Sequence, residues 1–211
     1  MLNYGIELEF FVKNSEDKII PAIEVTANVD GNPVIGEIRT GIHNNIVDCI
    51  FELKKLLFLE QEKLTKKICT LHLYDNIKVD NDFLKNLRKS NVYVENKHVA
   101  ILEELSIYPK GSTGKVLSKN IIKASLQVNF SNNIELSYTK KKKEHKIYSN
   151  EIFDYIYFIS KLDVAFKEDI IRTQRVKGVY AIKQGKLGKR IEYRSLPNDI
   201  NLDKLLNVLN N

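Results

Sequence analysis

The sequence predicts an α+β domain in which helices cover one face of a mainly antiparallel sheet and the other face of that sheet is polar. Two stretches, 44–66 and 149–171, carry apolar residues at helical spacing. Four short segments instead alternate apolar residues with acids, amides or arginines, which places the two kinds on opposite faces of a strand. These segments are 5–11, 36–40, 125–131 and 190–194. A sheet face of acids, amides and arginines is suited to bind metal and phosphate.

The first third of the chain is predicted to form strands around a long amphipathic helix. The expected elements are a strand at 3–13, polar turns at 14–18 and 30–33, a strand at 34–39, a helix at 44–66 and a strand at 68–74. Asn, Asp, Gly and Pro mark the turns. The helix is predicted because its apolar residues, from Ile46 to Leu64, recur three and four positions apart.

The rest of the chain is predicted to add further strands and two helices. The expected elements are a short helix at 82–89, strands at 91–94, 98–107 and 121–130, a basic hairpin at 134–148, a helix at 149–171 capped by Ser149 or Asn150, a basic segment at 172–189, a strand at 189–195 and a C-terminal helix begun by Asp199 or Asn201. The segment 110–115 resembles a phosphate-binding loop but lacks its first glycine, and we interpret it as an ordinary loop.

Size and composition narrow the class of protein. The 211 residues can bury a substantial core, and with no internal repeat or linker we expect one domain over 1–211. No run approaches the roughly 20 apolar residues that span a bilayer, and the N-terminus does not read as a signal or transit peptide, so we expect a cytoplasmic protein without membrane contact. Cys49 and Cys69 lie in apolar segments and are predicted to be buried free thiols.

The net charge of +6 indicates an anionic partner without naming it. Much of the excess comes from Lys140–Lys143 and Lys146. No aromatic residues are interleaved with these lysines, so a solvated loop is favoured and nucleic acid is disfavoured as a partner.

Glu7 and Glu9 lie two positions apart on one strand, so their carboxylates are about 6–7 Å apart along it. Two acids this close repel unless a cation lies between them. Magnesium suits this position, because it takes carboxylate oxygens together with water and nucleotide phosphates. The alternative is an edge strand whose charges face water.

Arg190, Glu192 and Arg194 share one strand face, with the acid between two arginines. Such a pattern forms either a structural ion-pair ladder or the set that phosphoryl transfer needs, with a carboxylate for metal and guanidinium groups for phosphate charge. Glu37 and Arg39 repeat the combination on another predicted strand.

These motifs resemble a known superfamily. Residues 5–11 are similar to the first active-site strand of the glutamine synthetase and glutamate–cysteine ligase superfamily of carboxylate–amine ligases, with its pattern Gly-x-Glu-x-Glu-Phe. Residues 190–197 resemble the late Arg-x-Glu-x-Arg strand of that superfamily, and 36–40 resemble the strand that adds a further acid. The order and spacing are most similar to the small phage-type COOH–NH2 ligases (amidoligases).

The resemblance implies a glutamine synthetase-like catalytic domain that uses ATP and magnesium. Such an enzyme converts a carboxylate to an acyl phosphate, which an amine then attacks to give an amide; the two substrates are not specified by the sequence. The implied roles are catalysis by Arg190, Arg194 and Arg39, ATP or phosphate binding by Arg172, Arg175, Asn129 and Lys177, metal binding by Glu7, Glu9, Glu37, Gln127 and Glu192, and an acid near the incoming amine at Asp30.

Two alternatives to the active ligase stay open. The superfamily usually has His-x-His on the third strand, where this chain has Gln127 and Asn129. A ligase fold kept as a binding or regulatory protein accounts for that difference and predicts no magnesium-dependent ATP turnover. A basic nucleic-acid-associated protein that uses the lysines of 140–146 is the more distant alternative. Assembly into a homo-oligomer is compatible with each of these functions.

Overall fold

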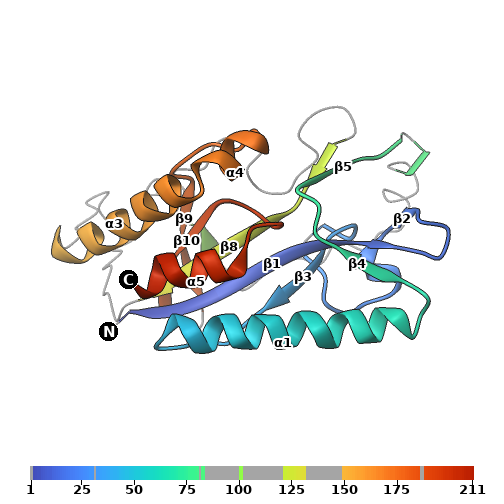
Figure 1. Ribbon diagram of the computed structural model, residues 1–211, viewed down its shortest axis with the longest axis horizontal. Coiled ribbons are helices and arrows are strands. Elements are labelled where there is room, and N and C mark those ends of the chain that lie inside the picture. Colours follow the sequence, from blue (N-terminus) through green and yellow to red (C-terminus); the bar gives the residue numbers. More distant parts are fainter. Residues whose placement is uncertain are drawn as a thin grey trace.

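The computed structural model describes residues 2–30, 32–80, 82–83, 100–101, 121–131, 149–185 and 188–211 (Figure 1). The predicted loop at 110–115 and the predicted basic hairpin with Lys140–Lys143 lie outside these residues, and so do most of the predicted helix at 82–89 and the predicted strands at 91–94 and 98–107.

The described strands are β1 (Asn3–Lys13), β2 (Ile19–Ile20), β3 (Gly36–Arg39), β4 (Thr70–His72), β5 (Asn76–Lys78), β6 (Ala100–Ile101), β7 (Ile121–Lys123), β8 (Ser125–Ser131), β9 (Tyr180–Gly185) and β10 (Gly188–Pro197). The described helices are the short 3-10 helix η1 (Ala22–Glu24) and the α-helices α1 (Ile46–Thr65), α3 (Ser149–Ala165), α4 (Lys167–Arg172) and α5 (Leu202–Asn210). The predicted α+β class with a mainly antiparallel sheet is confirmed.

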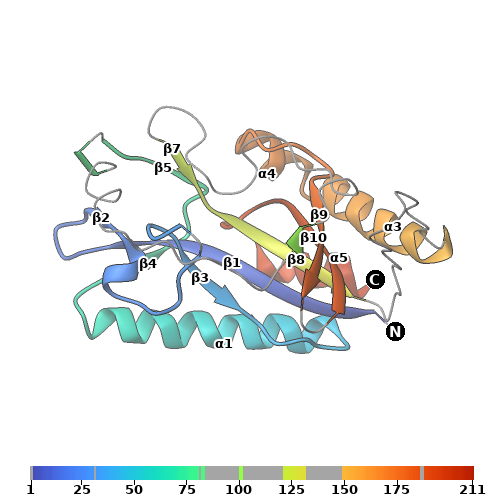
Figure 2. The same cartoon turned by 180° about the vertical axis from the view of Figure 1, so that it is seen from behind.

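One eight-stranded sheet organises the molecule. Its order is β2-β1-β8-β10-β9-β6, and β3 and β4 also pair with β1. All described strand pairs are antiparallel. On β1, Glu7 lies opposite Arg39 of β3 and opposite Gln127 of β8, while Glu192 of β10 lies opposite Asn129. The pairing therefore brings the four predicted polar segments together on adjacent strands (Figure 2).

The apolar face of this sheet packs against helices. Core residues include alternate positions of β1 and β8, such as Ile6, Leu8 and Val128, and they form one cluster with residues of α1, α3 and α5. Figure 1 shows α5 in front of β1 and β8, with α1 and α3 on either side of it. Cys49 and Cys69 are free and buried, as predicted, and burial raises the pKa of the Cys49 thiol to about 11. No helix among the described residues is long and apolar enough to span a membrane.

A β-bulge in β10 keeps its side chains on the correct faces. Tyr193 pairs with Val128, but Leu196 pairs with Leu126, so β10 contains one more residue than β8 over this step. The extra residue lets Tyr193 and Leu196 both enter the core, although they are three positions apart. Arg194 stays on the polar side, and the Ser195 hydroxyl accepts a hydrogen bond from the Val179 N–H.

Several elements differ from the sequence prediction, and β2, η1 and β5 were not predicted. The predicted helix at 149–171 is divided at Phe166, whose ring is buried in the core. The predicted strand at 121–130 is interrupted at Ala124, between β7 and β8. The segment predicted only to be basic, 172–189, contains β9, which pairs along most of β10.

Substitution of Gly36 by Ala is expected to destabilise the fold by about 1–3 kcal/mol, because a well-packed core resists additional atoms. Gly36 pairs directly with Phe10, and a Cβ at Gly36 would lie 2.2 Å from the Cζ of the fully buried Phe10 ring. Urea unfolding measures the effect. Gly41→Ala is the matched control, because the nearest atom to its Cβ would be at 3.5 Å. Equal midpoints for the two variants would contradict the expectation.

Candidate active site

The polar face consists of side chains from β1, β3, β8 and β10 that point away from the helices. Most of them are buried: Glu7, Glu9, Glu37, Ser125, Gln127, Asn129, Glu192 and Arg194. Arg190 is partly exposed, and about half of the Arg39 side chain is exposed. Burial of ionisable groups is costly unless they are paired or bind a cation. Their partners therefore determine what this face can bind.

Glu9 is held by donors from β8. Its carboxylate accepts hydrogen bonds from the Ser125 N–H at 2.7 Å, from the Ser125 hydroxyl at 3.0 Å and from Gln127 Nε2 at 2.8 Å. Asn198, in the turn after β10, donates from Nδ2 to the Glu9 carbonyl at 2.9 Å. Neutral donors thus fix the position of Glu9 without cancelling its charge.

Gln127 connects Glu9 to Arg194. Its Oε1 accepts a hydrogen bond from Arg194 Nη1 at 3.0 Å, and the same Nη1 also donates to Glu192. Because Gln127 Nε2 donates to Glu9, both ends of the amide are engaged by protein groups. For Gln127 to bind metal as predicted, its oxygen would have to use its second lone pair, directly beside the positive charge of Arg194.

Glu7 lies between two arginines from different strands. Its Oε1 accepts a hydrogen bond from Arg190 Nη2 at 3.1 Å and a longer one from Asn129 Nδ2 at 3.3 Å. Its Oε2 lies 3.8 Å from Arg39 Nε, and Arg39 also donates to Glu37. The Asn129 Oδ1 and the Arg190 Nε are buried, and neither has a hydrogen-bond partner among the described residues.

A compact group of acids lies at the β1–β3 side of the face. Carboxylate oxygens of Glu9, Asp30 and Glu37 all lie within 4.8 Å of one another. Asp30 belongs to the loop before β3, where its N–H donates to the Ile35 carbonyl at 3.0 Å. This spacing is compatible with a single hard cation that takes one oxygen from each residue.

The electrostatics of the face favour such a cation. Among its described side chains, five carboxylates (Glu7, Glu9, Asp30, Glu37, Glu192) meet three guanidinium groups (Arg39, Arg190, Arg194), so full ionisation leaves two negative charges in excess. Burial, reinforced by the Asp30 charge, raises the pKa of Glu9 to about 7 despite the opposing Arg194. Burial and the nearby Glu7 also raise the pKa of Glu37 well above its usual value. A divalent cation would oppose both shifts, because it favours the ionised carboxylates.

The metal-free protein is expected to lose stability as the pH rises from about 5 to about 8, by about 2 kcal/mol. The pKa of Glu9 is 4.5 in the absence of structure and about 7 when folded, so the folded state binds more protons between these values. The contribution of Glu9 to the free energy of unfolding is therefore fully present below the lower pKa. It is lost as the pH rises through the upper pKa, where the buried carboxyl ionises. Urea unfolding in the presence of a chelator measures it.

Magnesium is expected to reverse this trend, because it binds ionised carboxylates. The rise in melting temperature on addition of Mg2+ should be larger near pH 8 than near pH 6. An equal rise at both pH values would contradict the assignment of Glu9 to a metal site.

The structure does not place all of the predicted phosphate-binding residues on this face. Arg172 is exposed and pairs with Asp199 at 2.8 Å. Arg175 is held in a buried ion pair with Asp75 at 2.7 Å and also donates to a backbone carbonyl of Ala124. Lys177 is exposed in the loop before β9. Acidic partners away from the polar face account for the positions of both arginines.

Sequence reasoning missed two residues of the site. Ser125 shares the alternation of Gln127 and Asn129 and could have been assigned to the polar face from that pattern. Its N–H contact to Glu9 depends on strand register, which the pattern alone does not define. Asn198 follows β10 in a turn, and nothing in its local sequence indicates a contact with β1.

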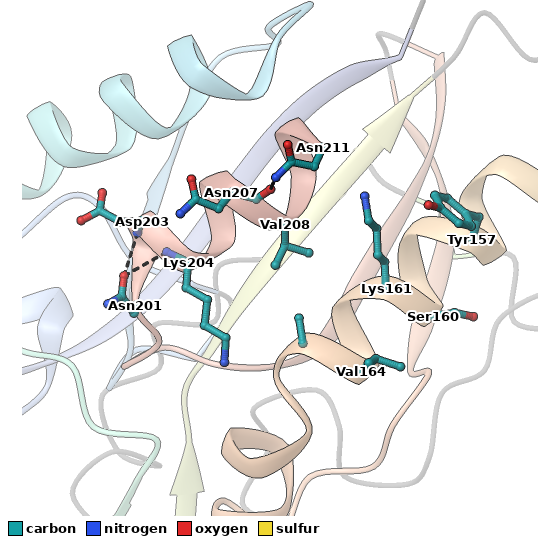
Figure 3. Close-up of a pocket in the computed structure, with 11 residues that line it drawn as sticks. Tyr157, Ser160, Lys161, Val164, Asn201, Asp203, Lys204, Asn207, Val208 and Asn211 are labelled. Carbon is teal, nitrogen blue, oxygen red and sulfur yellow. Dashed lines mark hydrogen bonds between the residues drawn. The ribbon is translucent and has the colours of Figure 1, made fainter.

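A separate groove of about 760 Å³ lies between α3 and α5, on the helical side of the sheet (Figure 3). Lys161 and Val164 of α3 and Lys204 and Val208 of α5 contribute to its lining. None of the predicted site residues lines this groove. The two features are therefore independent.

Comparison of the chain with models of protein families, with curated proteins and with solved structures finds no match. The polar face combines clustered carboxylates for a cation, from β1, β3 and the loop before β3, with partly exposed guanidinium groups for an anion, on β3 and β10. This combination suits a metal-bound phosphate ligand.

Proposed function

We propose that the protein is an ATP- and magnesium-dependent carboxylate–amine ligase that forms an amide bond through an acyl phosphate. The observation that carries the proposal is the single, largely buried face on which the acids and arginines of β1, β3 and β10 meet the amides of β8. The sequence motifs on three of these strands, β1, β3 and β10, resemble those of amidoligases. Contact geometry and sequence resemblance thus support the same chemistry.

Two groups of acids on this face fit a divalent cation. The geometry supports the first, formed by Glu9, Asp30 and Glu37; the second, Glu7 with Glu192, both paired with Arg190, is the pair that the sequence resemblance implies. Magnesium, when bound, would neutralise charge on the phosphates of ATP. All of these acids except Asp30 lie on strands, so the protein holds most of the required negative charge in place before ligand arrives.

The arginines divide into two roles. Arg39 and Arg190 are at least partly exposed, so their guanidinium groups can turn toward the phosphoryl group that is transferred. Arg194 is buried between Glu192 and Gln127, where it orients both side chains. We assign phosphate contact to the first two and positioning to Arg194.

The reaction needs two bond exchanges on this surface. A substrate carboxylate oxygen forms a bond to the γ-phosphorus of ATP and the bond to ADP breaks. The amine nitrogen then bonds to the acyl carbon, phosphate leaves and the amine loses a proton. Asp30 offers one carboxylate oxygen to the first acid group, and we assign its other oxygen to this proton or to the binding of the amine. Fixing both reactants on one face supplies rate through proximity.

A second candidate function is a ligase fold that binds nucleotide without turnover. It is favoured by the contacts of Gln127, because an amide oxygen that already accepts a hydrogen bond from the Arg194 guanidinium is a poor ligand for a metal ion. Under this function the polar face would bind Mg–ATP, but no carboxylate and amine would be joined.

The first test is the thermal stability of the protein with ATP, with and without Mg2+. A ligand that binds only the folded state raises the melting temperature. At a hundredfold excess over Kd it adds about 2.7 kcal/mol to the free energy of unfolding. We expect a magnesium-dependent rise in wild type that Glu192→Gln abolishes. The matched control, Glu16→Gln, changes an exposed acid paired with Lys18 and should retain the rise.

Hydroxylamine then separates the two candidate functions. As a small amine it captures acyl phosphates, so a ligase supplied with Mg–ATP and a carboxylate mixture should release ADP and phosphate and form a hydroxamate. Binding without turnover supports the second candidate. Absence of any magnesium-dependent stabilisation in wild type would contradict both.

A further inference from the structure

The outer side of α1 carries large apolar side chains in solvent. Phe51 is 68% exposed, Phe58 63% and Leu59 40%. The opposite side of the same helix is buried against the sheet through residues such as Ile50 and Leu53. In Figures 1 and 2, α1 forms the lower margin of the molecule, and no other described helix or strand lies on its outer side.

The exposed side chains of α1 form a stripe in which apolar and charged residues are arranged symmetrically along the helix. Phe51, Lys55, Phe58 and Glu62, here called the outer stripe, are all exposed and fall within an arc of about 60° at 100° per residue. Lys55 precedes Phe58 by three positions, and Glu62 follows Leu59 by three. A cation and an acid are thus equidistant from an apolar centre.

We propose that α1 docks antiparallel on α1 of a second copy of this chain, about a two-fold axis between Phe58 and Leu59. A two-fold interface must be complementary to itself, and this order of charges meets that condition. In this register Lys55 lies level with the partner's Glu62, and Glu62 with the partner's Lys55. The exposed rings and Leu59 are removed from water at the centre.

The ends of the stripe fit the same register. Phe51 lies level with Lys66 of the partner subunit, a residue that is exposed. A lysine ammonium group over the face of an aromatic ring makes a favourable cation–π interaction. A shift by one turn would place Lys55 against Phe58 and leave the charges of Lys55 and Glu62 unmatched. The charge order therefore selects one register.

The expected dimer is weak. A pair of helices in contact over about three turns buries less than the roughly 1,200–2,000 Å² of a standard stable interface. We expect a Kd on the order of 10 µM. The polar face lies on another side of the sheet from α1, so each copy keeps its candidate active site.

Sedimentation velocity of the full chain from about 1 to about 200 µM tests the proposal, since the dimer fraction follows mass action. Wild type should shift from monomer toward dimer. Phe58→Asp should remain monomeric throughout. Val164→Asp is the matched control, because Val164 is an apolar residue of α3 that is 78% exposed, and it should dimerise as wild type does.

Charge reversal tests the register. Lys55→Glu and Glu62→Lys should each weaken dimerisation at least about tenfold, because two attractive pairs become repulsive. The double variant Lys55→Glu with Glu62→Lys should restore it. A monomer at every concentration, or a dimer indifferent to Phe58→Asp, would overturn the proposed surface; failure of the double variant to recover would overturn the antiparallel register.

Discussion

Glu37→Gln is expected to make the metal-free protein more stable and insensitive to magnesium. Glu37 is buried beside Glu7, and its pKa is raised well above the usual value by burial and by that neighbour. A glutamine resembles the protonated acid: its oxygen can accept from Arg39, and its NH2 group can donate to Glu7. The melting temperature at about pH 8 should rise by about 3 °C or more.

The same substitution removes a carboxylate from the group formed with Glu9 and Asp30, so stabilisation by Mg2+ and by Mg–ATP should be lost. Glu60→Gln is the control. Glu60 is equally buried but lies on α1, where it accepts hydrogen bonds from Thr26 and Asn28. This control should lose stability and keep the magnesium response. A Glu37→Gln protein that still responds to magnesium would refute the cation site.

Arg175→Met is expected to lower stability by about 3 kcal/mol or more, because breaking a buried ion pair leaves an uncompensated charge. Arg175 and Asp75 are both buried, and Arg175 also donates to the Ala124 carbonyl. Urea unfolding measures the loss. The magnesium-dependent effect of ATP should persist in whatever fraction of the variant is folded, because the arginine is engaged with Asp75.

Arg172→Met is the matched control for this experiment. Arg172 lies three positions earlier and forms an exposed pair with Asp199, and exposed pairs contribute about 0–1 kcal/mol. Similar stability losses in the two variants would contradict the structural role of Arg175. Selective loss of ATP binding in either variant would instead support the phosphate role that the sequence resemblance implies.

The fold class and the main elements could be predicted because their patterns are local. Alternation identifies β1 over 3–13, and helical spacing identifies α1 within one or two residues of its observed ends. Asn201 caps α5, as one of the two predicted alternatives. β9 was missed because its six residues, 180–185, do not alternate apolar and polar side chains, and pairing with β10 decides its conformation.

The candidate site was predictable only where strand alternation determines it. Glu7, Glu37 and Glu192 reach one face because each lies on a strand of the same sheet. The positions of Arg172 and Arg175 depend on acids distant in sequence, Asp199 and Asp75, and no local pattern indicates such partners. The same holds for Asn198, which reaches the backbone of Glu9 across 189 positions.

The residues of β8 and β10 that contact β1 are distant from it in sequence, and this distance affects the order in which the sheet can form. Glu9 meets Ser125 across 116 positions and Glu7 meets Arg190 across 183. During synthesis β1 and β3 can pair early, but β10, which carries Arg190 and Arg194, is made much later than both. Pairing over such distances is slow, on the order of milliseconds to seconds in small domains. Until β10 is made, the nascent chain carries a crowded acidic hairpin, and β10 later places two guanidinium groups beside these acids.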